Sequence, residues 1–423
     1  MSRAGWPRVK LAGLVDLVSG FPFKSGGFTA ALDDIPLVKG ENVHQGYIDW
    51  NKAKRWPRDQ DDGMEKYWLK PGDVILAMDR PWIEAGLKQA CIRKHDPPSL
   101  LVQRVSRLRG LDGLLTDYLR HLIGSPSFTD YIKPIVTGIN VPHISGAQIK
   151  GFEFPLPPLP VQRRVASILS AYDDLIENNT RRIAILEEMA RRIYEEWFVR
   201  FRFPGHEGVR MVESELGLMP EGWRTATVGE VAAYINRGIA PKYDDTAACL
   251  VVNQKCIRDQ RLSLGEARKQ SKPVPLDKAI RLGDVLINST GVGTLGRVAQ
   301  VLVPIDNCTV DTHVSIVRPG RDCDPDYFGL TLLAQQTHFE AQGVGSTGQT
   351  ELSRGRIAET SIVVPPLAVQ RAFAEIVRPM RHLTVTLQNK SLNLRTTRDF
   401  LLPKLICGEL DVSTLPEPEA LAA

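Results

Sequence analysis

A glycine-rich segment has the spacing of a dinucleotide-binding loop. Gly291, Gly293 and Gly296 match the pattern G-x-G-x-x-G, and they follow the strand-like run 284–287. This pattern holds a pyrophosphate only where a helix begins, because the amide groups of the first helical turn contact the phosphates. Residues 297–303, however, are rich in valine and typical of a strand. We therefore expect a glycine-rich hairpin loop here.

Residues 96–99 raise a second possibility, base methylation. Asp96-Pro97-Pro98-Ser99 matches three of the four residues of the D-P-P-Y loop with which adenine methyltransferases grip a flipped base. The stacking aromatic is missing and no cofactor loop precedes the segment, so a surface turn is expected. The chain also has no G-x-x-x-x-G-K-S/T phosphate loop, and none of its eight histidines has a partner at metal-binding helical spacing. The residues predict no catalytic centre and no metal site.

Basic residues near predicted turns are candidates for contact with a polyanion. In the first half they are interleaved with tryptophan and tyrosine: Lys39, Lys52, Lys54, Arg55, Arg80 and Lys88, with Trp50, Trp56, Tyr67 and Trp82. The second half has a similar set: Lys242, Lys255, Arg258, Arg261, Lys269, Lys272 and Arg297. Basic side chains beside aromatic and amide groups suit phosphate contact and groove readout. For any single residue, a solvated face over core tryptophans is the alternative.

Composition sets the frame for these candidates. The 423 residues are 43% apolar and 24% charged, which is typical of globular proteins and sufficient for two to four domains. No long apolar run predicts a membrane span, and six scattered cysteines favour a reducing cytoplasm. The net charge of +4 permits a nucleic-acid partner without requiring one.

The chain repeats itself. Residues 157–163 (Pro-Pro-Leu-Pro-Val-Gln-Arg) return as 365–371 (Pro-Pro-Leu-Ala-Val-Gln-Arg), an offset of 208 residues (370 − 162). The run Gly-Asp-Val-Ile-Leu at 72–76 returns in similar form at 283–287, an offset of 211 (284 − 73). Because the offsets nearly agree, we interpret the chain as two similar halves. A protein built twice is expected to bind or read something twice.

Each half is expected to end in a long helix. Residues 161–198 contain neither proline nor glycine, and apolar residues recur at heptad spacing. One row holds Val165, Tyr172, Leu186 and Ile193, interrupted by Asn179; the adjoining row holds Leu169, Ile176, Ile183, Ala190 and Trp197. Asn179 is expected either to fix the helix register or to reach solvent. The helix would be roughly 55 to 60 Å long, which suits a spacer.

The offset of 208 residues places a second apolar row in the second half. Its members are Phe373, Met380, Leu387, Leu394 and Leu401. Pro379 is expected to kink this helix or split off its first turns, and Pro403 to mark its end. The short connection after Phe201 favours antiparallel packing of the two helices, since each globule then lies beside the helix end to which it is tied. The fold class predicted is α+β, with two mixed α/β domains separated by long antiparallel helices.

The repeat and the helices define six segments. They are a first domain (1–155), a first spacer helix (156–203), a linker (204–218), a second domain (219–363), a second spacer helix (364–412) and a loose tail (413–423).

Several motifs resemble the specificity subunit of type I restriction-modification systems. These are the segment 214–223 at a domain start, the twin Pro-Pro-Leu-x-x-Gln-Arg helix openings, and the two helix endings 197–201 and 401–410. The likeness spans nearly the whole chain, in the family's order of recognition domain, helix, recognition domain and helix. The chain departs from the family pattern at Pro379 and at its abrupt start at Gly5-Trp6. These departures leave it open whether the two halves match strictly at the methyltransferase-docking surface.

The resemblance implies a function in DNA recognition. Loops 78–81 with 86–88, 288–297, 19–24 and 236–242 would face double-stranded DNA, which adds Lys24, Arg237 and Thr290 to the candidate contacts. Each domain would read one half of a bipartite site, and the helices would set the spacing and dock two modification subunits. S-adenosylmethionine, ATP and Mg would belong to these and to the restriction subunits, so the chain itself would carry no cofactor and no enzymatic activity.

Two other functions fit parts of the pattern. A coiled-coil scaffold joining two protein-binding domains would have the same helices, but no salt-dependent affinity for DNA. A self-contained adenine methyltransferase would need a cofactor loop and an intact D-P-P-Y segment.

Overall fold

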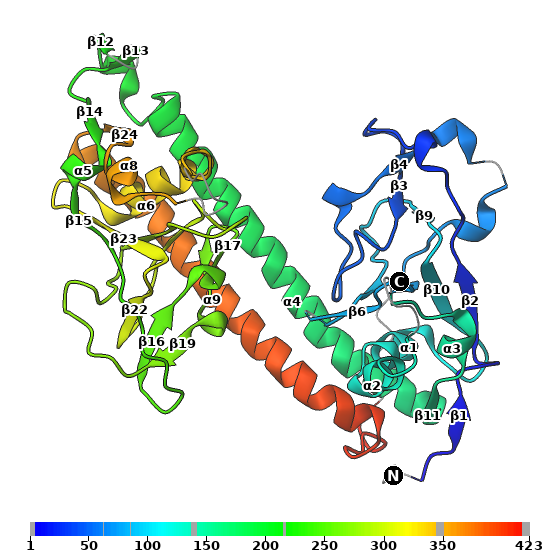
Figure 1. Ribbon diagram of the computed structural model, residues 1–423. Coiled ribbons are helices and arrows are strands. Elements are labelled where there is room, and N and C mark those ends of the chain that lie inside the picture. The colour runs from blue at the N-terminus through cyan, green and yellow to red at the C-terminus, as the bar shows by residue number, and fades with distance from the viewer. Residues whose placement is uncertain are drawn as a thin grey trace. The chain divides into compact units, whose positions relative to one another are not determined.

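The computed structural model describes residues 5–61, 63–84, 86–136, 142–214, 217–343 and 351–416. The chain forms two compact units (Figure 1). Unit 1 contains Met1–Glu177 and Leu392–Ala423, and unit 2 contains Asn178–Ser391. Each unit holds one mixed α/β domain and parts of both long helices. Within the described residues, no helix is long and apolar enough to cross a membrane.

The domain of unit 1 is built on two sheets. A four-stranded antiparallel sheet has the order β2-β10-β5-β8, and a three-stranded sheet has the order β4-β3-β9, in which β3 and β9 are parallel. Strand β5 lies inside the first sheet, and all four of its residues are buried. The strands of unit 1 are β1 (Arg8–Lys10), β2 (Val15–Ser19), β3 (Ile35–Val38), β4 (Arg55–Trp56), β5 (Val74–Ala77), β6 (Trp82–Ile83), β7 (Gly86–Leu87), β8 (Gln89–Cys91), β9 (Leu100–Leu101), β10 (Val105–Gly110) and β11 (Glu153–Pro155). Its short helices are α1 (Thr116–Ile123), α2 (Pro126–Ile132) and α3 (Gly146–Lys150).

The domain of unit 2 repeats this plan. Its four-stranded sheet has the order β15-β23-β20-β21, and its three-stranded sheet has the order β19-β16-β22, with β16 and β22 parallel. The strands are β12 (Met211–Ser214), β13 (Gly217–Pro220), β14 (Arg224–Thr227), β15 (Ala232–Arg237), β16 (Cys249–Val252), β17 (Ile257–Arg258), β18 (Arg261–Leu262), β19 (Arg268–Gln270), β20 (Val285–Asn288), β21 (Val298–Gln300), β22 (Cys308–Val310), β23 (Val314–Pro319) and β24 (Ser361–Val364). The short helices are α5 (Val228–Val231), α6 (Pro325–Ala334), α7 (Gln336–Ala341) and α8 (Arg354–Ala358). The internal repeat predicted from sequence is thus confirmed in strand order.

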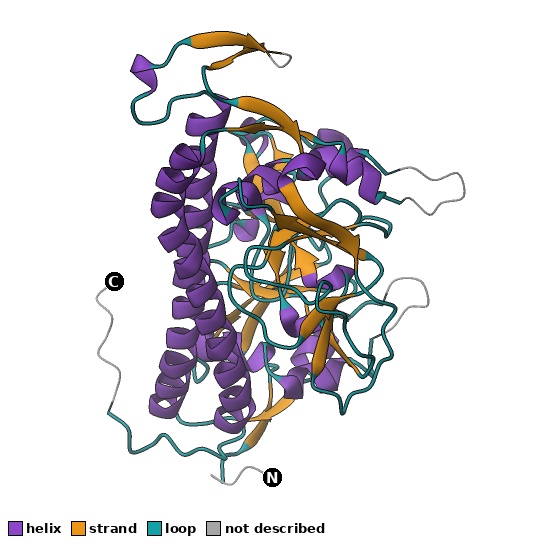
Figure 2. Cartoon of the chain, turned by 90° about the vertical axis from the view of Figure 1, so that its left-hand side faces the viewer, coloured by secondary structure: helices purple, strands orange, loops and turns teal. Residues whose placement is uncertain are grey.

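The two long helices are antiparallel. Helix α4 (Leu159–Tyr194) is followed by one π-helical turn, Glu195–Val199, and helix α9 spans Leu367–Ile406. In unit 1, Val165 near the start of α4 shares a core with Leu405 near the end of α9. In unit 2, Trp197 after the end of α4 packs on Phe373 near the start of α9, with ring centroids 5.7 Å apart. Figure 2 shows the two helices side by side.

Of the two outcomes predicted at Pro379, a kink or a split, the split did not occur, and the end predicted at Pro403 was wrong. Helix α9 continues through Pro379 without being split, and it ends at Ile406, beyond Pro403. Pro379 is exposed, so the carbonyl that loses its amide partner can be hydrated there, and the packed residues on either side hold the helix together. The segment predicted as a linker, 204–218, also contains β12 and the first two residues of β13, with which β12 pairs. Most of the predicted tail, 417–423, lies outside the described residues.

A buried glutamine explains the repeated helix-opening motif. The Gln162 amide accepts a hydrogen bond from the backbone N–H of Leu115 (2.9 Å) and donates to the carbonyls of Gly113 (2.8 Å) and Pro157 (2.9 Å). Its counterpart Gln370 makes the same three bonds in unit 2, to Asp324 N (2.9 Å), Asp322 O (3.2 Å) and Pro365 O (2.8 Å). Each glutamine therefore ties the first turn of a long helix to its domain.

Candidate nucleic-acid interface

The hairpin loop between β5 and β8 carries two of the candidate cations in unit 1. Lys88 is half-buried, and its ammonium group donates to the Gly40 carbonyl. Burial lowers the pKa of Lys88, and the nearby charge of Arg80 lowers it further. Arg80 is exposed and has a left-handed backbone, with φ at 44°. Its N–H donates to Pro142 O at 2.6 Å. The Arg80 side chain is thus exposed to solvent, while its backbone is fixed by the hydrogen bond to Pro142.

Asp79 fixes the base of this loop. Its carboxylate accepts a hydrogen bond from Arg104 at 2.8 Å and lies 2.6 Å from Nδ1 of His143. At the tip, Trp82 is 40% exposed, and the Lys133 ammonium lies 4.7 Å from its ring centroid. An exposed aromatic ring next to cations is a surface that suits nucleic-acid contact.

Unit 2 has a hairpin loop at the same place, between β20 and β21. Its glycines Gly291, Gly293 and Gly296 all have positive φ, between 72° and 106°. The expected hairpin is confirmed by the antiparallel pairing of Val285–Ile287 with Val298–Gln300. Arg297 donates to the Gly293 carbonyl at 2.7 Å, and both residues line an open cavity of about 360 Å³. Val292 between the first two glycines is 87% exposed.

Polar side chains support this loop from neighbouring strands. Gln254 follows β16 and donates to the Thr290 hydroxyl at 2.5 Å and to its carbonyl at 2.9 Å. His313 precedes β23, and its Nδ1 lies 2.8 Å from the same hydroxyl. Asn288 is fully buried and donates to the carbonyls of Gln254 and Thr294, at 3.1 Å each. The candidate Thr290 is therefore held by two neighbouring segments, through Gln254 and His313.

The early loop of each domain depends on one glycine. A Cβ at Gly20 would lie 2.3 Å from the Val102 carbonyl oxygen, and a Cβ at Gly238 would lie 1.8 Å from the Val310 carbonyl oxygen. No other residue fits either place. Beside Gly238, Arg237 forms an ion pair with Glu351 at 2.6 Å. Both glycines lie in segments that the sequence predicted to face DNA.

The structure places the remaining candidates at several other sites. Lys39 pairs with Glu41 at 3.4 Å, and Arg55 donates to the Asp34 carbonyl at 2.8 Å. The following four are exposed in loops or on short elements: Lys24, Lys242, Lys255 and Arg258. Lys54 is likewise exposed and precedes β4. The structure therefore brings Arg80 close to Lys88. It also places Lys255 next to Gln254, which contacts Thr290. The other candidate cations of this paragraph do not form a group.

Both domains match one known protein family. Residues 6–188 and 220–394 each match the type I restriction modification DNA specificity domain. The chain belongs to this family. Its two matched segments correspond to the two domains with their helices, so the chain is a specificity subunit with two DNA specificity domains.

Individual relatives agree with the family. The type I restriction enzyme MjaIX specificity subunit of Methanocaldococcus jannaschii is 27% identical over 314 residues, which cover 72% of this chain and 71% of that protein. The EcoAI specificity subunit of Escherichia coli is 33% identical over 174 residues, covering 41% of this chain but only 28% of that protein. A solved S subunit from M. genitalium has the same fold, with a TM-score of 0.61 and 16% identity over 95% of this chain and 96% of that one.

The helix residues expected to pair in this specificity subunit differ in burial. The following are buried: Val165, Leu169, Ile176, Asn179, Ile183, Phe373 and Leu387. The following are half-buried: Tyr172, Leu186, Ile193, Met380, Leu394 and Leu401. Their further assignment to subunit docking stays a prediction. In the segment 96–99, Pro97 and Pro98 are exposed, as expected of a surface turn, whereas Ser99 is buried.

Sequence reasoning missed the residues that support the loops. Gln254, His313 and Asp79 stand on segments whose proximity depends on strand pairing, such as that of β20 with β23. A signal did exist for Asp79, since it directly precedes the candidate Arg80. For Gln254 and His313, the sequence offered none without the strand order.

Proposed function

We propose that each domain of this specificity subunit reads one half of a bipartite DNA site through its β5–β8 or β20–β21 hairpin loop. The observation that carries the proposal is the same topological position of the two loops, each with cations beside an exposed apolar tip. Arginine and lysine contact phosphates and guanine edges, and apolar side chains contact the thymine methyl group. Different loops on the same strand plan would give an asymmetric site.

We further propose that α4 and α9 set the distance between half-sites and dock two modification subunits. Helices of 36 and 40 residues are about 54 and 60 Å long. Half-sites one DNA turn apart are separated by roughly 34 to 36 Å, which is within the reach of such a pair. The chain would act in the cytoplasm without catalysis of its own. S-adenosylmethionine would belong to the modification subunits, and ATP and Mg to the restriction subunits.

Sequencing the methylated adenines in the host genome gives the site directly. The expected result is a bipartite motif with a fixed gap, and the assembled complex should bind a duplex of that motif with a strong dependence on salt. Absence of any such binding would refute the proposal and favour a protein scaffold. Binding of S-adenosylmethionine by the purified chain alone would instead indicate a methyltransferase.

Deleting one heptad from each helix tests the spacing role. The deletion removes Ile176–Arg182 and the stretch 389–395, which the pairing of Asp173 with Arg398 places opposite. Seven residues span about 10.5 Å of helix, so the recognised gap should shorten by about three base pairs. An unchanged gap would contradict this role.

Replacing residues 1–155 by the recognition domain of another specificity subunit tests the independence of the readers. One half of the methylated motif should change and the other should stay. A change in both halves would contradict independent reading.

A further inference from the structure

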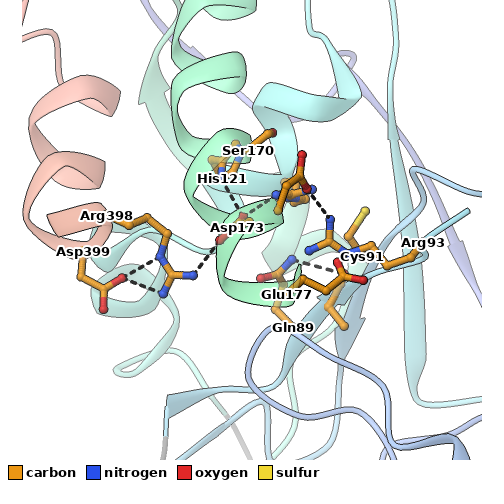
Figure 3. A network of polar contacts seen from close by, with 12 residues as sticks. Gln89, Cys91, Arg93, His121, Ser170, Asp173, Glu177, Arg398 and Asp399 are labelled. Atoms are coloured by element: carbon orange, nitrogen blue, oxygen red, sulfur yellow. Dashed lines mark hydrogen bonds and ion pairs between the residues drawn. The ribbon is translucent and has the colours of Figure 1, made fainter. Parts of the chain in front are cut away.

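The domain of unit 1 docks on its long helix through a buried carboxylate. Asp173 of α4 pairs with Arg120 of α1. Its other oxygen accepts a hydrogen bond from Arg398 of α9 at 2.7 Å (Figure 3). Only 15% of the Asp173 side chain is exposed, and 12% of the Arg120 side chain. Burial would raise the pKa of Asp173, but the charges of Arg120 and Arg398 bring it below its ordinary value. The carboxylate is thus held ionised between three elements.

The neighbouring contacts have the same polarity. His121 Nε2 lies 3.2 Å from the hydroxyl of Ser170, one turn before Asp173. Further along α4, Glu177 lies 3.4 Å from Nε of Arg93, a residue that follows β8 (Figure 3). In this junction α4 therefore supplies the acids, and the domain supplies the bases Arg120 and Arg93.

At the matching positions of α9 in unit 2 the polarity is reversed, although the domain's Arg261 also pairs with Glu187 of α4. Helix α9 supplies Arg378 and Arg381, and the domain supplies Asp326 and its helix-capping neighbour Asp324. Nε of Arg378 lies 2.7 Å from Asp326, and Nη1 of Arg381 lies 3.2 Å from the other oxygen of that carboxylate. Arg381 is only 7% exposed. At these positions α9 is basic and the domain is acidic.

The two junctions use the same positions of the repeat. Arg381 follows Asp173 by the repeat offset of 208 residues (381 − 173), and Arg378 follows Ser170 by the same offset (378 − 170). Ser170 with Asp173 is called the first seat, and Arg378 with Arg381 the second seat. In domain 2, Gly329 takes the place of Arg120 (329 − 120 = 209). A Cβ at Gly329 would lie 1.7 Å from Oε1 of Gln300, so an arginine has no room there.

We propose that the charges of the two seats select the domain that docks on each. Each seat binds its own recognition domain and excludes the other one. Both domains have an aspartate at the place of Asp326, since Asp117 matches it (326 − 117 = 209), so the difference lies at Arg120 and Gly329. Domain 1 on the second seat would add Arg120 beside Arg381, and domain 2 on the first seat would leave the buried Asp173 without Arg120. A buried pair of like charges and a buried carboxylate without its partner are both strongly disfavoured, and such costs exclude a wrong partner. The inference rests on the proposed function, because the seats would fix which half-site each helix end presents and restrict the exchange of recognition domains.

Charge exchange in the full chain tests the first seat without DNA. Asp173→Arg or Arg120→Asp alone should raise the hydrogen-exchange rates of the α1 amides about tenfold, because like charges then face each other. The double variant restores an opposite pair, and it should recover at least half of that change on a logarithmic scale. Ser167→Arg is the control, with an expected change below about threefold, since Ser167 is an exposed residue of α4 in the same unit. A double variant that exchanges as fast as the faster single variant would overturn the inference.

A transplanted domain tests rejection directly. In a chain with residues 1–155 in place of 219–363, both seats hold domain 1. Arg378→Ser with Arg381→Asp then rewrites the second seat with the residues of the first. The probe is a duplex with the half-site of domain 1 in both halves, and the rewritten chain should bind it at least tenfold more tightly than the unaltered chimera. Equal affinities would overturn the selection by charge. Failure of the native chain to bind its own site would instead refute the proposed function. The hydrogen-exchange test of Asp173 and Arg120 would remain valid in that case.

Discussion

The two domains share their buried polar contacts and differ in their exposed hairpin loops. Both contain the glutamine tie of Gln162 or Gln370, and both bury an aspartate on the four-stranded sheet, Asp73 or Asp284. Their hairpin loops differ: one has the small hairpin β6–β7 with Trp82, and the other has three glycines with positive φ.

The difference separates two kinds of constraint. A buried polar group without its partner is costly, so both copies must retain the glutamine and aspartate contacts. Exposed loop residues carry no such penalty and can differ between the copies. Two domains that dock alike and read differently are what an asymmetric DNA site requires.

The largest expected effect comes from the buried aspartate of domain 2. Asp284 is fully buried and accepts two hydrogen bonds of 2.8 Å from Arg318 and one of 2.7 Å from the Arg281 N–H. Asp284→Ala leaves the Arg318 charge without its partner and should cost about 3 to 5 kcal/mol. The measurement is the hydrogen-exchange free energy of the β20 amides, with exposed Asp245→Ala as control.

The matching change in domain 1 sharpens this comparison. Asp73→Ala should cost roughly half as much, because the Arg109 side chain is 32% exposed and that of Arg318 only 12%. Equal losses at the β5 and β20 amides would show that exposure of the arginine does not govern the cost.

The glutamine ties should be nearly equivalent. Gln162→Leu and Gln370→Leu each leave three backbone groups without partners, and each should lower the free energy of unfolding by about 2 to 3 kcal/mol. Urea unfolding of the full chain measures this, with exposed Gln60→Leu as control. A loss in only one variant would contradict the equivalence of the two junctions.

Acid should weaken unit 1 through a group that unit 2 lacks. Burial, with the charge of Arg120 next, lowers the pKa of His121 to about 3 from its ordinary 6.5. Between these values the unfolded chain binds the proton and the folded chain does not, so stability falls as pH falls below 6.5. At pH 5 the loss should be about 2 kcal/mol at the α1 amides.

The variant His121→Gln isolates this effect. It should remove that part of the pH dependence, whereas the α6 amides of unit 2 should not respond to the substitution, because Leu330 occupies the matching position (330 − 121 = 209). A variant as acid-sensitive as the native chain would exclude His121 as the cause.

The smallest effect concerns the loop cations. Arg297→Ala should lower the slope of log affinity against log salt by about one, as expected for one lost phosphate contact. Lys88→Ala should change the slope less, because burial and the charge of Arg80 lower the pKa of the Lys88 ammonium, whereas a guanidinium stays charged. Arg191→Ala on α4 is the control, since its guanidinium already pairs with Glu188 and Glu195. An unaltered slope for Arg297→Ala would remove it from the contacts.

Local patterns predicted much of this architecture. The heptad row through Leu169, Ile176 and Ile183 is buried as expected, since helical spacing alone puts these side chains on one face. The glycine pattern ending at Gly296 was not interpreted as a dinucleotide site, because the residues that follow it are typical of a strand and not of a helix. This reason was also local. Pro379 did not split its helix, because packing on both sides of a residue can outweigh the lost hydrogen bond.

The sequence by itself determined the repeat, the two long helices and the family motifs, because these depend on spacing along the chain. Only the tertiary structure decided what the repeated glutamine binds, how Gln254 and His313 meet at Thr290, and why Asp173 and Arg381 carry opposite charges. Those contacts join residues that are tens to hundreds of positions apart, as with Asp173 and Arg398, separated by 225 positions. Spacing along one helix fixes a face, but it does not specify which distant side chain will cover that face.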